Sequence, residues 1–295
     1  MALIGKVELA FEAKAILGEG PVWDAQRQCL WFVDIKAPAI WRFDPSTGDN
    51  ASYPAPDQVG WVLPTSCGQL LAGLRDGLHL FDPESGTFDK RHNIHGMPEG
   101  NRLNDACVDR FGRVWFGSMD DAEEQASGRF YCFDRGELNP AGPDAITITN
   151  GPAADADGTV MYFTDTLGQA IYRSHIDSDG ALREWQPLID IAADFPDAYP
   201  DGPIVDSEGC LWTGLWNGFA VARYSPEGQL LGQVAIPAAN VTKMAFGGPD
   251  LKTAYVTTAS KGLADHERTA QPLAGAVFTF RSDVSGIPIA PVEIK

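Results

Sequence analysis

Long apolar runs are missing from this sequence. No stretch approaches the roughly 18–20 consecutive apolar residues that a membrane-spanning helix needs. The N-terminal stretch MALIGKVELAFEAKAILGEG contains neither a sustained apolar segment nor the small-residue cleavage site of a secretory signal. We therefore expect no membrane partner and a cytoplasmic location.

Positive charge is also scarce. The chain of 295 residues has 22 Lys and Arg against 40 Asp and Glu, a formal net charge of −18. This excess repels phosphate backbones, and no Lys/Arg-rich run offsets it, so we expect no nucleic-acid partner. The balance suits a protein that handles small neutral or cationic molecules, or one that holds a metal ion.

Several redox and catalytic motifs are absent. The sequence lacks GxSxG, a P-loop and a GxGxxG that opens a helix, which argues against the common serine-hydrolase, nucleotide and dinucleotide sites. Cysteine is rare and never forms a CxxC pair, so the five cysteines are predicted to be reduced core residues. They are Cys29, Cys67, Cys107, Cys132 and Cys210.

A short strand-like motif recurs along the chain, as in LWFVD, VWFGS and LWTGL. Its six copies are centred, at intervals of 40 to 50 residues, on Trp31, Leu71, Trp115, Tyr162, Trp212 and Tyr255. A second strand follows each copy, and Gly, Asp and Pro punctuate the joins, whereas helical spacing of apolar residues is rare. A period of this length with several short strands is typical of an all-β propeller.

The length accommodates six such units and not a seventh. We therefore predict a six-bladed β-propeller formed by residues 1–295 as a single domain. A segment at about residues 5–15 precedes the first unit, and we expect it to close the ring as an outer strand of the last blade. A β-sandwich with many strands does not explain six near-equal intervals.

The strand that opens each unit shares one register. Aligned on the turn that follows, four of these strands read EGPVWD, NDACVD, NGPAAD and DGPIVD. The first strand of each blade lines the central channel. Residues at equivalent positions of these strands should therefore form one ring around the axis. The ring positions, in chain order, are Glu19, Gly60, Asn104, Asn150, Asp201 and Thr242.

Two of these ring positions are carboxylates and two are asparagine amides. Carboxylates that converge in a channel of low dielectric repel each other, and a cation cancels that repulsion. Such ligands suit Ca²⁺, Mg²⁺ or Mn²⁺ and do not exclude Zn²⁺ or Fe²⁺. We therefore predict a central metal-binding channel with one divalent ion. The alternative is ordinary turn chemistry, but Glu is a poor turn former and the shared register would be incidental.

Two other patterns are interpreted as structural. His92 and His95 have the spacing of metal ligands but no third His or Cys nearby, so we assign them to a solvated loop that could rim the channel. DADG (155–158) and DSDG (177–180) resemble the start of a calcium-binding loop. Both lack the Gly and the distal Glu of such a loop, and we interpret them as hairpin turns.

Four motifs occur in order at the spacing of the blades: LGEGPVW, NRLNDACVDRFGRVWFGSMD, ITNGPAADADG and YPDGPIVDSEGCLWTGLW. Together they closely resemble the regucalcin/gluconolactonase family of six-bladed propellers, also called senescence marker protein-like, over essentially the whole chain. The resemblance implies that one divalent metal is held by Glu19, Asn150 and Asp201.

The resemblance also implies an activity, because family members that hydrolyse sugar lactones look most similar. The expected enzyme is a lactonase that opens xylono-, arabinono- or gluconolactone to the aldonic acid in sugar catabolism. The RxND motif implies that Arg102 and Asn104, with Asp105 following, bind the substrate. Asp201 is the candidate that positions or deprotonates the attacking water. Trp61 either lines the channel mouth against a sugar ring or serves blade packing.

Two other functions stay open at this point. A related metallohydrolase that acts on phosphotriesters or other esters would use the same ring. A non-catalytic, regucalcin-like propeller would bind calcium without turnover, but it leaves Arg102 beside the metal channel unexplained. In every case we expect a monomer.

Overall fold

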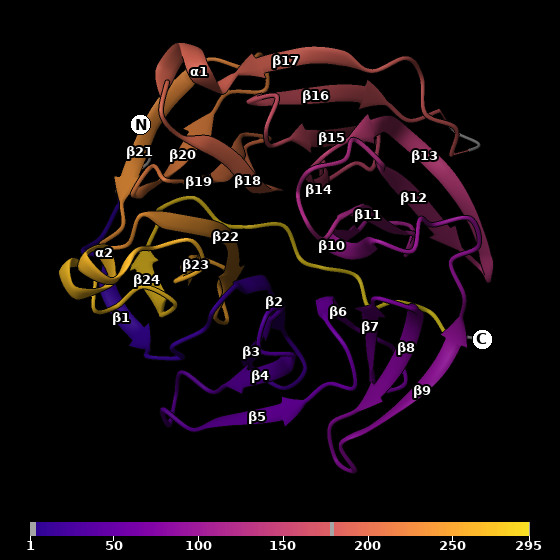
Figure 1. The fold of residues 1–295 in the computed structure, drawn as a ribbon, viewed down its shortest axis with the longest axis horizontal. Coiled ribbons are helices and arrows are strands. Elements are labelled where there is room, and N and C mark those ends of the chain that lie inside the picture. The colour runs from indigo at the N-terminus through magenta and orange to yellow at the C-terminus, as the bar shows by residue number, and fades with distance from the viewer. Residues whose placement is uncertain (1–3, 178–179, 295) are drawn as a thin grey trace.

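The computed structural model describes residues 4–177 and 180–294. Within these ranges the strands form six four-stranded sheets, and Figure 1 shows them as blades around a central axis. The prediction of an all-β, six-bladed propeller is confirmed.

Each blade runs outward from the axis. The innermost strands are β2 (Gly18–Asp24), β6 (Val59–Pro64), β10 (Asn101–Val108), β14 (Thr149–Ala154), β18 (Tyr199–Val205) and β22 (Asn240–Gly247). The second strands are β3 (Cys29–Asp34), β7 (Leu70–Leu74), β11 (Val114–Asp120), β15 (Val160–Asp165), β19 (Leu211–Trp216) and β23 (Thr253–Ala259).

The outer half of each blade is built in the same way. The third strands are β4 (Ala39–Phe43), β8 (Gly77–Asp82), β12 (Gly128–Asp134), β16 (Ala170–His175), β20 (Ala220–Tyr224) and β24 (Val277–Arg281). The outermost strands are β5 (Asn50–Pro54), β9 (Thr87–His92), β13 (Glu137–Ile146), β17 (Gln186–Asp190), β21 (Leu230–Ala235) and β1 (Glu8–Phe11). Two short helices, α1 (Ile191–Asp194) and α2 (Asp265–Ala270), lie in connecting segments.

The repeated motif forms the second strand of each blade. Every residue of β3 and β7 is buried, because neighbouring blades cover both faces of the sheet. In three blades the Trp of this strand donates through Nε1 to an Asp at the end of the innermost strand. The pairs are Trp31–Asp24 at 3.3 Å, Trp115–Asp109 at 2.9 Å and Trp212–Asp206 at 2.8 Å. This bond accounts for the Asp that ends three of the four aligned stretches.

Strand β1 closes the ring of blades. It pairs with β24 of the sixth blade, with Leu9 opposite Phe278. Phe11 of β1 reaches into the first blade, where its ring lies 5.5 Å from that of Trp41 and 5.6 Å from that of Phe43. One strand therefore ties the last blade to the first.

We expect Phe11→Ala to lower the free energy of unfolding by about 2 kcal/mol, because a half-buried aromatic ring loses its partners where the ring of blades closes. Urea denaturation measures this loss. Phe111→Ala is the matched control, since Phe111 is 62% exposed, and it should change the same quantity by less than about 0.5 kcal/mol. Equal effects of the two substitutions would contradict the role given to β1.

The C-terminal segment crosses the ring at the end of the channel where the innermost strands finish. It runs from the sixth blade toward the second and is yellow in Figure 1. Val292 of this segment donates to the Pro64 carbonyl at 2.8 Å and accepts from the Ser66 amide at 3.1 Å. Residues 287–290 and the innermost strands line an apolar cavity of about 660 Å³. The chain's own C-terminal segment thus covers this end of the channel.

Each innermost strand carries a register shift near its ring position. The shifts lie between Glu19 and Val22, Val59 and Trp61, Leu103 and Ala106, Asn150 and Ala153, Pro200 and Pro203, and Val241 and Met244. An extra residue at such a bulge bends the strand and redirects its side chains. Because all six innermost strands bulge at equivalent positions, the residues aligned in the sequence lie in one layer of the channel.

Candidate functional site

The structure brings five of the predicted residues to one cavity. Glu19, Arg102, Asn104, Asn150 and Asp201 line a cavity of about 270 Å³ at the end of the channel where the innermost strands begin. They come from four blades, through β2, β10, β14 and β18. The cavity lies at the opposite end of these strands from the apolar cavity.

Two of the lining residues are buried carboxylates. Glu19 is 3% exposed and Asp201 is 4% exposed. Burial, and then the charge of Asp105, raise the pKa of Glu19 to about 8. Burial, followed by the charges of Glu19 and Asp105, raises the pKa of Asp201 well above its ordinary value. The ionised form of Asp201 is thus disfavoured by burial and by two neighbouring carboxylates.

Asp201 also carries an unsatisfied acceptor. Its Oδ1 is buried and has no hydrogen-bond partner among the described residues. Glu19 is only partly satisfied, through one bond of 3.0 Å from the Gly20 amide to Oε2. A buried carboxylate oxygen without a donor is costly, and coordination to a cation would remove the cost.

The side-chain amide of Asn150 is held in one orientation. Its Nδ2 donates to Thr166 Oγ1 at 2.9 Å, and its Oδ1 accepts from Asn104 Nδ2 at the same distance. A carbonyl oxygen has two lone pairs, so Oδ1 keeps one for a further partner. Thr166 therefore orients a predicted metal ligand, a role that no sequence pattern indicated.

The other two ring positions supply no ligand. Thr242 Oγ1 donates to the Gly18 carbonyl at 2.6 Å, and a side chain at Gly60 would meet the Leu103 carbonyl oxygen at 2.6 Å. Among the described residues no three His, Cys, Asp or Glu side chains form a metal cluster. The set that fits a cation is thus two carboxylates, Glu19 and Asp201, with one amide oxygen. Hard oxygen ligands of this kind suit a divalent cation.

The raised pKa of Glu19 predicts how stability depends on pH without metal. The unfolded chain loses the Glu19 proton near pH 4.5, whereas the folded protein keeps it to about pH 8. Because the native state then binds more protons, stability should fall between these values, by up to about 1.4 kcal/mol per pH unit for one group.

Urea denaturation in a chelator, from pH 5.5 to pH 8, measures this slope. Glu19→Gln should reduce the slope, because the variant lacks the titrating group. Addition of Ca²⁺ should remove it, because the cation replaces the proton. A stability that rises with pH in the chelated wild-type protein would contradict the burial argument.

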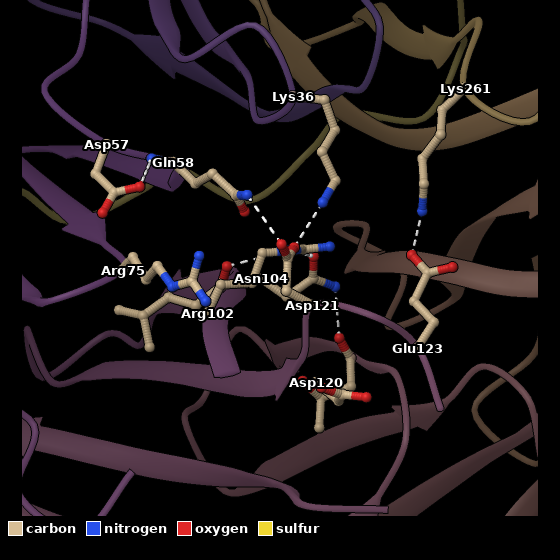
Figure 2. Close-up of polar contacts among 12 residues, drawn as sticks. Lys36, Asp57, Gln58, Arg75, Arg102, Asn104, Asp120, Asp121, Glu123 and Lys261 are labelled. Atoms are coloured by element: carbon tan, nitrogen blue, oxygen red, sulfur yellow. Dashed lines mark hydrogen bonds and ion pairs between the residues drawn. The ribbon is translucent and has the colours of Figure 1, made fainter. Parts of the chain in front are cut away.

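Arg102 is buried beside the predicted ligands and is held by several partners. Its Nη1 donates to Asn104 Oδ1 at 2.6 Å, and its Nε donates to Asp121 Oδ1 at 2.9 Å. Asp121 also accepts from Lys36 at 2.6 Å and from Gln58 at 3.0 Å, as Figure 2 shows. Burial alone would raise the pKa of Asp121, but the bonds from Lys36 and Gln58 lower it to about 2. The guanidinium is therefore fixed by an ionised carboxylate.

An ion pair between Glu123 and Lys261 also lines this cavity. Figure 2 shows the Lys261 ammonium directed at the Glu123 carboxylate. The Lys261 Nζ also lies 6.0 Å from the centre of the Trp216 ring, a cation–π distance. Sequence reasoning missed this pair, because its partners are 138 residues apart and neither belongs to a motif.

Asp105 and Trp61 lie outside this cavity. Asp105 accepts at Oδ1 from Lys243 Nζ at 2.5 Å and at Oδ2 from the Gly151 amide at 2.9 Å. Trp61 is 1% exposed, lines the apolar cavity and packs 5.6 Å from the Phe116 ring. This placement is not the one expected of Asp105 as a substrate contact, and for Trp61 it agrees with the alternative of blade packing. Each is the residue directly after a ring position in the sequence, so its side chain lies outside the ring layer.

The weaker sequence patterns lie away from the cavity. His95 is exposed, and the half-buried ring of His92 lies 5.5 Å from that of Phe133. DADG forms a turn closed by a 3.1 Å bond from the Gly158 amide to the Asp155 carbonyl. Two residues of DSDG, 178–179, lie outside the described residues.

The cysteine prediction needs one correction. All five cysteines are free thiols, but only Cys29 and Cys210 are buried, whereas Cys107 and Cys132 are half-buried. Cys67 is exposed, so the prediction of a core position is wrong for it. It lies in the turn between β6 and β7, where no blade covers it.

In the parts of the chain that the structure describes, we find no helix with the length and hydropathy needed to cross a bilayer.

Comparison with known proteins gives consistent matches over more than nine tenths of the chain. The chain is 32% identical over 272 residues to 6-deoxy-6-sulfogluconolactonase of Pseudomonas putida, covering 92% of this chain and 93% of the relative. It is 33% identical over 296 residues to L-arabinolactonase of Azospirillum brasilense, covering 97% and 95%. The crystal structure of a calcium-binding protein, regucalcin, from Agrobacterium tumefaciens superposes with a TM-score of 0.93 at 27% identity, covering 98% of each chain.

A family model described as the SMP-30/Gluconolactonase/LRE-like region matches residues 17–260, which include every residue of the candidate cavity except Lys261. The resemblance found in the sequence motifs is therefore confirmed. This chain belongs to the SMP-30/gluconolactonase/LRE-like family.

Proposed function

We propose that this protein hydrolyses sugar lactones to aldonic acids with the help of one divalent metal ion. The observation that carries the proposal is the unpartnered, buried Oδ1 of Asp201, which lies beside Glu19 in a cavity that Arg102 also lines. Relatives named as lactonases of sulfogluconolactone and arabinolactone support the same substrate class. The cavity of about 270 Å³ suits a ligand the size of one sugar ring.

Glu19, Asn150 and Asp201 are the residues that would hold the ion. When bound, a divalent ion polarises a carbonyl and lowers the pKa of a coordinated water. Asp201 accepts the proton of the attacking water through a carboxylate oxygen, as the water oxygen bonds to the lactone carbonyl carbon. The ring C–O bond then breaks, and the proton passes to the released ring oxygen, which leaves as a hydroxyl of the aldonic acid.

Arg102 and Asn104 are proposed to bind and orient the lactone. A guanidinium fixed by Asp121 offers charge-assisted hydrogen bonds to the carbonyl or hydroxyl oxygens of the sugar. Asn104 lies between Arg102 and Asn150 and is bonded to both, so it couples the substrate contacts to the metal ligands.

A lactone panel tests this proposal. Five- and six-carbon lactones with 1,4- and 1,5-rings are assayed with the chelated protein, before and after addition of Ca²⁺, Mn²⁺, Mg²⁺ or Zn²⁺, and spontaneous opening is subtracted. We expect turnover of at least one lactone only with metal. Rates equal to spontaneous opening with every metal would contradict the proposal.

Two alternatives predict other results in the same panel. A metal-dependent esterase would hydrolyse phosphotriester or simple ester substrates faster than any lactone. A calcium-binding protein without catalysis, an alternative favoured by the likeness to regucalcin, would bind Ca²⁺ and turn over nothing.

We also propose that residues 1–295 form one domain, which acts as a cytoplasmic monomer. Size-exclusion chromatography with light scattering should then give the chain mass of 31.8 kDa.

A further inference from the structure

The channel has a second layer directly behind the ring positions. It consists of the residues that follow each ring position: Gly20, Trp61, Asp105, Gly151, Gly202 and Lys243. Two of these six residues, Asp105 and Lys243, are charged, and three are glycines. One of these glycines, Gly202, leaves space for the Lys243 side chain.

The two charged residues pair across this layer. Lys243 Nζ donates to Asp105 Oδ1 at 2.5 Å and to the Ala106 carbonyl at 3.2 Å. The exposed fractions of the Lys243 and Asp105 side chains are 5% and 1%. Asp105 belongs to β10 of the third blade and Lys243 to β22 of the sixth. Third and sixth blades are opposite in a ring of six, so the ion pair spans the channel.

The pair is in direct contact with the segments that carry the predicted metal ligands. Asp105 Oδ2 accepts from the amide of Gly151, the residue after Asn150, at 2.9 Å. A Cβ on Gly202, the residue after Asp201, would lie 2.6 Å from Lys243 Cδ. Glycine at this position therefore makes room for the lysine stem.

These contacts place a third carboxylate, and the ammonium that neutralises it, directly behind the proposed metal site. We propose that Lys243 is a positioning residue, which pairs with Asp105 across the channel and thereby keeps this carboxylate from adding its charge to the ion site. The inference rests on the proposed metal site of Glu19, Asn150 and Asp201. It explains why a lysine is buried behind a site for a cation, where an unpaired ammonium would repel the ion.

The alternative is that the pair only ties two blades together. The two explanations differ in the sign of their effects on metal affinity. If charge is what matters, removal of Lys243 leaves an unpaired carboxylate and should tighten binding of a cation. Removal of the Asp105 charge leaves an unpaired ammonium and should weaken it. If the ion pair only holds the two blades together, both changes loosen the site and both weaken binding of the cation.

The test is isothermal titration of the chelated full-length protein with Ca²⁺ alone. We expect Lys243→Met to bind Ca²⁺ about tenfold more tightly than wild type, and Asp105→Asn to bind it about tenfold more weakly. The double variant should return to within about threefold of wild type, because both charges are gone. Lys90→Met is the matched control: Lys90 pairs with Asp76 on the outside of the second blade, and its loss should leave the affinity unchanged.

Weaker binding in both single variants, or a double variant weaker than either, would overturn the inference. If Lys243→Met does not fold, the double variant compared with Asp105→Asn still isolates the lysine charge, and its loss should tighten binding about tenfold. Failure of the wild-type protein to bind Ca²⁺ and the other divalent ions would instead overturn the proposed metal site itself, so the two failures are distinct.

Discussion

Asp201→Asn is expected to lower kcat/KM for sugar-lactone hydrolysis by about 1,000-fold. The substitution keeps the shape of the side chain but removes a negative charge from the candidate metal site and the group that accepts the proton of water. Because Asp201 is buried and its Oδ1 has no partner, little else in the protein depends on its charge. The change should therefore leave the fold intact and should not lower the melting temperature.

The rate is measured by titrating the acid released, at several metal concentrations. Asp197→Asn is the matched control, because Asp197 is an exposed carboxylate four residues earlier that does not line the cavity. It should retain the wild-type rate. Activity of Asp201→Asn within a few fold of the control would remove Asp201 from the mechanism.

Arg102→Gln is expected to lower kcat/KM about 100-fold, mainly through a higher KM. The loss follows from the removal of charge-assisted bonds to the substrate, since Arg102 lines the cavity and its orientation is fixed by Asp121 and Asn104. Arg102→Lys should not restore the rate, because an ammonium cannot reproduce the fork of the guanidinium.

Steady-state kinetics on the preferred lactone separate KM from kcat, and a Ca²⁺ titration checks that the variant still binds metal. Arg75→Gln is the control, because Arg75 donates to the Glu99 carbonyl and does not line the cavity. A fall in kcat without a change in KM would assign Arg102 a different role from substrate binding.

The sequence was sufficient to predict the ring layer for a physical reason. Side chains alternate regularly along a strand, and each innermost strand bulges at an equivalent position. Residues that align in the sequence therefore occupy equivalent positions in the blades. The alignment was anchored by the Asp that ends each aligned stretch. In three blades this Asp binds the Trp of the second strand, so the anchor is itself a structural feature.

The layer behind the ring could not be assigned in the same way. Asp105 follows Asn104 in a motif, but its bond to Lys243 joins residues 138 positions apart. Lys243 stands in the unremarkable stretch VTKMAF, and only the assembled ring brings it across the channel. The same holds for Thr166 and Lys261, whose roles depend on contacts between separate strands or blades. A signal for Lys243 was nevertheless present, since it occupies the register position of Asp105 in another blade.

Anomalous diffraction from crystals grown with Mn²⁺ tests most directly whether separate blades share one ion. We expect a single strong peak per chain in the cavity, about 2.0–2.6 Å from oxygens of Glu19, Asn150 and Asp201. The same crystals of Asp201→Asn should lose most of the peak. A peak elsewhere in the molecule, or none at saturating Mn²⁺, would contradict the claim that these three side chains hold a metal.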